Sequence, residues 1–139
     1  MGLVYADIEL ISTEDLSLAY RGFLTQDGVR KKKVRALVDT GSYMLSINEH
    51  IRKQLDLRKL DSHEVELADG SLQMVDIVGP VDIRFKNRST TCRAVVFPND
   101  VEVLLGAIPM EDMDVLVDPK QEQLIVNPAN PYIARKSMK

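Results

Sequence analysis

Short apolar runs interrupted by turn residues are the feature that most limits what this chain can fold into. Val, Leu and Ile dominate the apolar 45% of the sequence, whereas aromatic residues make up only 5% and Trp is absent. Branched aliphatic residues suit strands better than long helices. Many short strands with turns about every 8–12 residues are typical of all-β folds that close into a barrel. We therefore expect a mainly β protein with one or two short helices, arranged as a closed barrel.

Turn and capping residues place the expected elements along the chain. The expected strands cover residues 3–10, 63–68, 72–78, 81–85, 91–97, 101–105, 115–117 and 124–126. Gln26-Asp27-Gly28 and Asp69-Gly70 predict tight turns, because Asp-Gly tolerates the positive φ that hairpins need. Gly79-Pro80 is expected to break the strand pattern. Asn48 suits the cap of a helix that reaches Leu57, and a second short helix is expected within Ala107–Met113.

Length and composition favour one globular domain. The chain has 139 residues and a formal net charge of −3, and it contains no apolar run long enough to span a bilayer. We expect a folded domain over residues 1–127 and a partly flexible tail over residues 128–139. The single cysteine, Cys92, cannot form an intramolecular disulfide, which fits a reducing, cytoplasmic setting.

The sequence favours no cofactor, no metal, and no nucleic-acid or membrane partner. His50 and His63 lack the spacing of metal ligands. The basic run Arg30–Arg35 is the one segment for which nucleic-acid binding is an alternative. A net acidic chain without aromatic residues between those charges favours a solvated strand face instead.

Asp39 is the residue whose setting points most directly to chemistry. It follows the apolar run Ala36-Leu37-Val38 and begins the turn that continues through Thr40, Gly41 and Ser42. A carboxylate at the end of a buried strand is positioned and partly desolvated, and the neighbouring hydroxyls can donate hydrogen bonds to it. These are the conditions for a tuned acid or base. The alternative is a turn aspartate that only satisfies its own loop.

One such aspartate is not enough to hydrolyse a peptide bond with a water molecule. One carboxylate must take a proton from water while a second, protonated carboxyl polarises the carbonyl. Two ionised carboxylates about 3 Å apart repel each other by on the order of 5 kcal/mol at an effective dielectric constant of about 20, so such a pair shares one proton. The chain has a single Asp-Thr-Gly and no Asp-Ser-Gly. A two-fold homodimer would supply Asp39 twice, and the monomer is then expected to be inactive.

Four segments follow one another in an order that resembles a known family: Ala36–Ser42, Val65–Ser71, Val103–Gly106 and Val115–Pro119. They resemble, in turn, four parts of the retropepsin-like aspartic proteases. These parts are the active-site motif, the mobile flap hairpin, the apolar segment beside the catalytic loop, and the strand and turn after the following helix. The family comprises single-domain retroviral and retrotransposon proteases with bacterial and cellular relatives. The resemblance implies one lobe of an acid-protease barrel per chain, in a two-fold homodimer.

The resemblance also implies roles for the residues of the active-site loop. Asp39 would be the catalytic carboxylate, and Thr40 would brace the two loops across the dimer. Gly41 would let the substrate backbone approach, and Ser42 would orient the carboxylate. Leu105-Gly106 would support the loop from beneath.

The flap implied by the resemblance would close over the substrate. Its tip comprises Ala68, Asp69, Gly70 and Ser71. Closure would exclude water and would pair the flap with an extended peptide as an added strand. Val75, Ile77 and Leu105 are expected to line apolar subsites.

Together these features predict a homodimeric aspartic endopeptidase that acts on extended peptide or protein substrates. The alternative is a catalytically silent module that keeps the fold for binding or dimerisation, because fold alone does not determine function. The complete Asp-Thr-Gly-Ser sequence favours the enzyme, since a scaffold has no chemical need for the aspartate.

Overall fold

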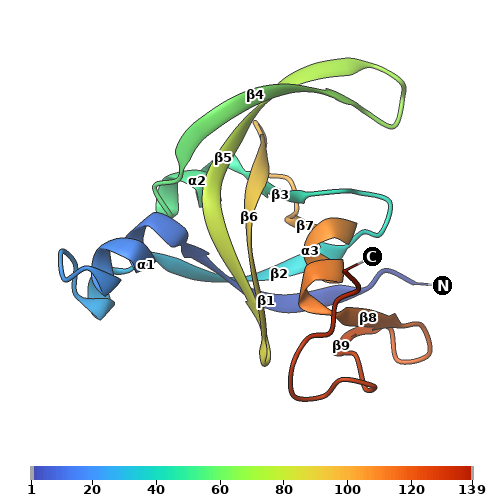
Figure 1. Ribbon diagram of the computed structural model, residues 1–139. Helices are drawn as coiled ribbons and strands as arrows, with labels where there is room; N and C mark the ends of the chain where they lie inside the picture. The colour runs from blue at the N-terminus through green and yellow to red at the C-terminus, as the bar shows by residue number, and fades with distance from the viewer. Residues whose placement is uncertain (1, 139) are drawn as a thin grey trace.

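Residues 2–138 are described by a computed structural model, and they form a mostly β structure with three short α-helices (Figure 1). The strands are β1 (Tyr5–Ser12), β2 (Lys31–Val38), β3 (Leu45–Asn48), β4 (Arg58–Glu66), β5 (Leu72–Phe85), β6 (Arg88–Phe97), β7 (Leu104–Leu105), β8 (Val115–Asp118) and β9 (Gln123–Val126). The helices are α1 (Thr13–Tyr20), α2 (Glu49–Gln54) and α3 (Ala107–Met113), together with the 3-10 turn η1 (Gln26–Gly28). The mainly β prediction is confirmed, but three helices accompany the strands rather than one or two.

The strands form one sheet that curls back on itself. Its order is β4-β5-β6-β3-β7-β2-β1-β9-β8, and β1 also pairs with β5. β1 is antiparallel to β2 along its length, and its second half pairs with β5 from Glu9↔Arg84 to Ser12↔Val81. The expected break at Gly79-Pro80 is wrong, because both residues lie inside β5. Gly79 has φ +135°, which a glycine tolerates, and it lies where the pairing with β6 becomes irregular.

Residues 13–30 form a helical excursion between β1 and β2, which the sequence analysis did not predict. α1 begins because the side chain of Ser12 accepts a hydrogen bond from the backbone N–H of Asp15 at 3.2 Å. Glu14 and Asp15 lie in its first turn, where the helix dipole favours negative charge. The tight hairpin turn expected at Gln26–Gly28 is wrong, because these residues form η1 and the whole excursion joins the two paired strands.

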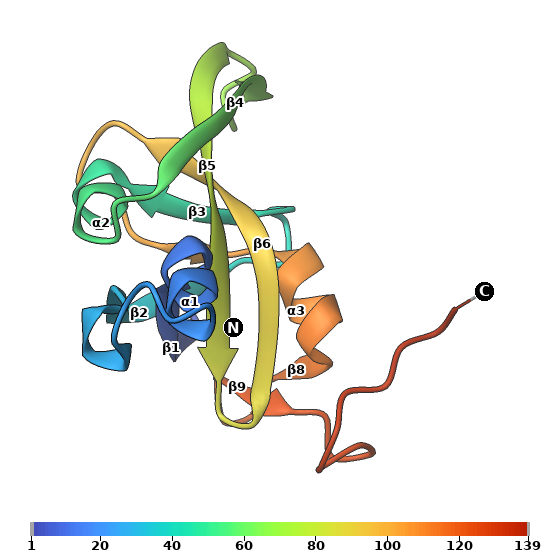
Figure 2. The ribbon, with the colours of Figure 1, turned by 60° about the vertical axis from the view of Figure 1, so that its left-hand side comes forward.

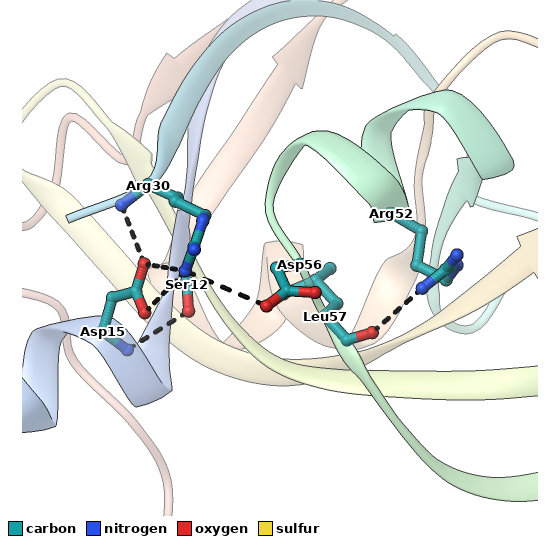
Figure 3. A network of polar contacts seen from close by, with 6 residues as sticks. All are labelled: Ser12, Asp15, Arg30, Arg52, Asp56 and Leu57. Atoms are coloured by element: carbon teal, nitrogen blue, oxygen red, sulfur yellow. Dashed lines mark hydrogen bonds and ion pairs between the residues drawn. The ribbon is translucent and has the colours of Figure 1, made fainter. Parts of the chain in front are cut away.

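A buried carboxylate ties this excursion to the sheet (Figure 3). Asp15 is only 5% exposed, and it accepts hydrogen bonds from the backbone N–H of Arg30 at 2.9 Å and from its guanidinium at 3.2 Å. The same guanidinium lies 4.0 Å from the carboxylate of Asp56, just after α2. One arginine therefore links α1, the start of β2 and the end of α2.

Aliphatic side chains from most of the strands pack into one core. Its most deeply buried members include Leu10, Leu45, Ile47, Leu55, Ile83, Leu105 and Met113. The predicted helix after Asn48 forms, since Asn48 accepts a hydrogen bond from the N–H of Ile51 at 2.9 Å and Ile51 is buried, but it ends at Gln54 and not at Leu57. Along the predicted strand 81–85, Val81, Ile83 and Phe85 are all buried in the core.

The basic run lies on an exposed face of the β1–β2 hairpin. Lys33 and Arg35 are exposed on β2, and they lie opposite Glu9 and Asp7 on β1. This arrangement favours the solvated strand face over a nucleic-acid site. Within the described range, residues 2–138, no helix has both the length and the apolar character needed to cross a membrane.

Gly106 joins β7 to α3 at a point where there is no room for a side chain. A Cβ atom at this position would lie 2.4 Å from the carbonyl oxygen of Met44 and 2.7 Å from that of Ser42. Both neighbours are backbone atoms, which cannot turn away as a flexible side chain can. The segment that follows the Asp39 turn therefore packs directly against the start of α3.

We expect Gly106→Ala to lower the free energy of unfolding by about 1–3 kcal/mol, because the new methyl group forces two backbone segments apart. Urea unfolding followed by circular dichroism measures the loss. Gly28→Ala is the matched control, since the neighbours of its added methyl group are side-chain atoms of Leu24 and Thr25, not backbone. Equal losses for the two variants would contradict the close approach at Gly106.

We expect Cys92 to react slowly with alkylating reagents while the protein is folded. Burial, with smaller contributions from the carboxylates of Asp82 and Asp112, raises the pKa of its thiol to about 12. At pH 8 the thiolate is then scarce, so alkylation by iodoacetamide is expected to be roughly a thousandfold slower than in unfolded protein. Mass spectrometry measures both rates, one in buffer and one in concentrated urea that unfolds the protein. Similar rates would refute the burial of this thiol.

Candidate active site

Backbone hydrogen bonds hold Asp39 from both sides at the end of β2. On one side β2 runs parallel to β7, and the N–H of Asp39 donates to the carbonyl of Leu105 at 3.0 Å. On the other side the N–H of Val38 donates to the carbonyl of Val4 at 2.8 Å. These bonds leave the main chain at Asp39 little freedom, so the carboxylate leaves the sheet in a defined direction.

The turn after Asp39 is closed by the aspartate itself. Its carbonyl accepts a hydrogen bond from the N–H of Ser42 at 3.1 Å, and its carboxylate accepts one from the N–H of Gly41 at 3.0 Å. Asp39 and Ser42 are partly buried, whereas Thr40 and Gly41 are exposed. A Cβ atom on Gly41 would lie 3.3 Å from the Asp39 carboxylate, so a side chain there would crowd it. Among residues 2–138 the carboxylate receives no hydrogen bond from the Ser42 hydroxyl, and its partner is a backbone amide.

α3 supports the same turn through its first two amides. The N–H of Ala107 donates to the carbonyl of Ser42 at 2.7 Å, and the N–H of Ile108 donates to that of Tyr43 at 3.0 Å. Amides in the first turn of a helix have no partner within the helix, so they are free to hold another segment. The Asp39 turn thus rests on β7 on one side and on the start of α3 on the other.

The predicted flap is the tip of a long hairpin that projects from the body. β4 and the first part of β5, residues 58–78, form this hairpin, which we name the arm, and it arches above β3 (Figures 1 and 2). Gly70 has φ +85°, and the Asp69 carboxylate accepts hydrogen bonds from the amide and the hydroxyl of Ser71. These bonds hold the pKa of Asp69 below its ordinary value, with the hydroxyl as the larger cause. All four tip residues, from Ala68 to Ser71, are exposed.

A small apolar cluster connects the arm to the segment after the Asp39 turn. Val75, Ile77 and Val95 are buried in it, and Met44 packs against them. The expectation that Val75, Ile77 and Leu105 line open subsites is wrong, because their side chains are at most 4% exposed. Tyr43, which directly follows the turn, is 77% exposed and is available to a ligand.

A hollow of about 320 Å³ lies beside the turn. Its lining residues are Gly2, Leu3, Val4, Leu37, Val38, Asp39, Thr40 and Val117. Most of them are apolar, and Leu3 is 68% exposed. The candidate catalytic carboxylate therefore borders an apolar recess that is open to solvent.

The structure brings the predicted loop residues together and keeps the flap tip apart from them as a separate unit. The turn from Asp39 to Ser42 meets Leu105-Gly106 directly, whereas residues 68–71 lie at the end of the arm. Residues 2–138 contain no group of three His, Cys, Asp or Glu side chains placed to hold a metal ion. A positioned carboxylate beside an open recess can activate a water molecule, and it needs an acidic partner to polarise a carbonyl.

Sequence reasoning missed the residues that reach the turn from distant parts of the chain. Val4 contributes a carbonyl, and Leu3 and Val117 contribute the apolar wall of the hollow. A backbone acceptor or a wall residue requires only the right position, not a particular side chain, so the sequence carries no local signal for it.

Comparison with family models adds an independent observation. A model described as aspartyl protease matches residues 25–108. The matched range contains β2, the Asp39 turn, the arm and Gly106, and it covers more than half of the chain. A comparison with curated proteins gives no match. From the family match and the geometry of this turn, we conclude that the chain belongs to the aspartyl protease family.

Proposed function

We propose that this protein is an aspartic endopeptidase whose active site is assembled from two copies of Asp39 in a two-fold homodimer. The observation that carries the proposal is the way the Asp39 turn is held, by Leu105 and Val4 through β2 and by α3 through Ser42. This arrangement fixes a carboxylate at the edge of an open recess in a chain of the aspartyl protease family. Such a preorganised carboxylate suits acid–base catalysis.

The proposed reaction divides the work between the two carboxylates. One ionised Asp39 takes a proton from a water molecule, whose oxygen attacks the peptide carbonyl carbon. The other Asp39 is protonated, and it donates a hydrogen bond to the carbonyl oxygen as negative charge develops there. The C–N bond then breaks, and a proton passes to the leaving nitrogen. The shared proton makes the pair titrate as a unit, so a bell-shaped dependence on pH is expected.

A second protomer has a suitable place to dock. The hollow beside Asp39 is walled by Leu3, Val4 and Val117, and burial of such apolar side chains drives association. Thr40 is exposed, so its hydroxyl is available to the facing turn. Docking at this surface would bring two Asp39 turns face to face.

The arm is proposed to cover the bound peptide. Its tip is exposed and closed by its own hydrogen bonds, so it can move as one piece on the base of β4 and β5. An extended peptide under the tip would be enclosed between the arm and the Asp39 turns, and water other than the reacting molecule would be excluded.

A catalytically silent binding or dimerisation module is the second candidate function. The apolar wall of the hollow favours docking whether or not cleavage occurs. The two candidates differ in what Asp39 must do, since only the enzyme requires its carboxylate. Substitution of this residue therefore separates them.

We expect Asp39→Asn to lower kcat/KM for cleavage of an unfolded protein such as casein by roughly 10²–10⁴-fold, because neither protomer then supplies an ionisable carboxyl group. Release of labelled peptides measures the rate, and sedimentation measures the dimer, which is expected to persist.

Asp118→Asn is the matched control for this experiment. Asp118 also closes its own turn, since its carboxylate accepts hydrogen bonds from the amides of Lys120 and Gln121 at 3.0 and 3.3 Å. We expect this variant to cleave as the wild type does. Full activity in Asp39→Asn would refute the proposed catalyst, and a wild type that dimerises without cleaving would favour the silent module.

We expect the specific activity to fall on dilution, because a monomer holds only one of the two carboxylates. Initial rates measured over a range of concentrations that spans the dissociation constant of the dimer should rise with the square of the concentration at its lower end. Analytical ultracentrifugation gives the dissociation constant. A rate proportional to concentration where only monomer is present would show that one chain suffices.

A further inference from the structure

The last part of the described chain folds back over the C-terminal end of α3. Residues 127–136, which we name the clasp, follow β9 through a series of turns and bends (Figure 2). The carboxylate of Asp114 accepts hydrogen bonds from the side-chain amides of Asn127 and Asn130 at 2.9 and 2.8 Å. It also accepts one from the backbone N–H of Arg135 at 3.0 Å. One carboxylate thus gathers three donors from a segment that has no regular secondary structure.

The end of α3 needs such donors because it is acidic. Asp112 lies in its last turn and Asp114 is its C-cap, and this turn contains no basic residue. Negative charge at the C-terminal end of a helix is unfavourable, because the helix dipole is already negative there. The clasp offsets the negative charge at both positions. It donates the three hydrogen bonds to Asp114, and its Lys136 lies 3.0 Å from Asp112. Hydrogen bonds from Asn127 hold the pKa of Asp114 below its ordinary value, and one from Thr90 does the same for Asp112.

A buried arginine adds to the dependence of this region on the clasp. Arg88 is only 3% exposed, and its Nη2 lies 4.0 Å from the Asp114 carboxylate and donates to the carbonyl of Asn130. Its Nε and Nη1 are buried without a hydrogen-bond partner among residues 2–138. A buried charge is costly unless it is paired. The clasp carbonyl is therefore one of the few groups that compensate this guanidinium.

The other end of α3 reaches the candidate catalytic turn. The amides of Ala107 and Ile108 hold the carbonyls of Ser42 and Tyr43, and this turn carries Asp39. Between its two ends α3 is a single short helix, and Pro109, Met110 and Met113 are buried along it. Movement of one end of so short a packed helix moves the other.

We infer that the clasp positions α3 and, through α3, the Asp39 turn, with Asp114, Asn127 and Asn130 as positioning residues. The inference concerns the regulation of the proposed active site, and its effect on cleavage rests on the proposed function. An event that pulls residues 127–136 away from α3 would loosen the Asp39 turn without touching a catalytic group.

Hydrogen exchange of a double variant, Asn127→Ala with Asn130→Ala, tests the inference without any substrate. The variant removes two of the donors to Asp114, so we expect faster exchange at the amide of Arg135 and at those of Ala107 and Ile108. The amide of Ile83, in the β5–β6 ladder, serves as the reference for global unfolding and is expected to keep its rate. Measurement is by heteronuclear NMR at a fixed pH.

Asn87→Ala is the matched control. Its side-chain amide also binds the clasp, at the carbonyl of Pro131 at 2.9 Å, but it does not contact the acidic end of α3. We expect unchanged exchange at Ala107 and Ile108 in this variant. Faster exchange at Arg135 in the double variant with no change at Ala107 and Ile108 would overturn the inference. No change at Arg135 would also overturn it, because the two asparagines would then not hold the clasp.

Peptide cleavage gives the second readout. We expect the double variant to lose roughly 10-fold to 100-fold in kcat with little change in KM, because the catalytic turn is misplaced while the binding surface remains. A change in KM alone would contradict the route through α3. If the wild type cleaves nothing, the proposed function fails, and the exchange experiment still decides whether the clasp holds the turn.

Discussion

The close approach of two backbone segments at Gly106 is the constraint on which the rest of the site depends. Because there is no side chain at this position, the carbonyls of Ser42 and Tyr43 reach the first amides of α3. Just before it, the carbonyl of Leu105 accepts the amide of Asp39. Four consecutive residues at one strand-to-helix junction, Leu105 to Ile108, thus locate the candidate catalytic turn. The carboxylate depends on main-chain geometry more than on any side chain beside it.

This dependence explains why local signals in the sequence predicted the turn and the helix α3 well. Apolar residues before Asp39, turn residues after it and a glycine at the β7–α3 junction each reflect a local backbone requirement. The arm was predictable for the same reason, since Gly70 adopts a positive φ and β4 pairs with β5 about it. Where a residue type is needed by the backbone at its own position, one sequence is enough to find it.

The parts that the sequence did not predict are those that depend on distant partners. α1 has a weak apolar face, and it is secured by the pairing of Asp15 with Arg30 across residues 13–30. β5 continues through Gly79-Pro80 because Gly79 pairs with Arg58 on β4 and the pairing with β6 resumes at Val81. The clasp is held by side-chain amides on Asp114, and nothing near Asn130 in the sequence indicates that partner. The homodimer, the role of each site residue and the flexibility of the tail remain predictions.

The clasp and the hollow have different relations to the same carboxylate. The hollow beside Asp39 is open and apolar, so the proposed second protomer adds what the chain lacks, a second acid. The clasp acts through polar contacts within the chain, and we infer that it secures what the chain already has, the position of the first acid, through Asp114 and α3. In the proposed dimer, activity would require both docking at one side of the turn and support from the other. A chain that docks but whose clasp is released would form the dimer with its two carboxylates out of register, so assembly and activity would be controlled separately.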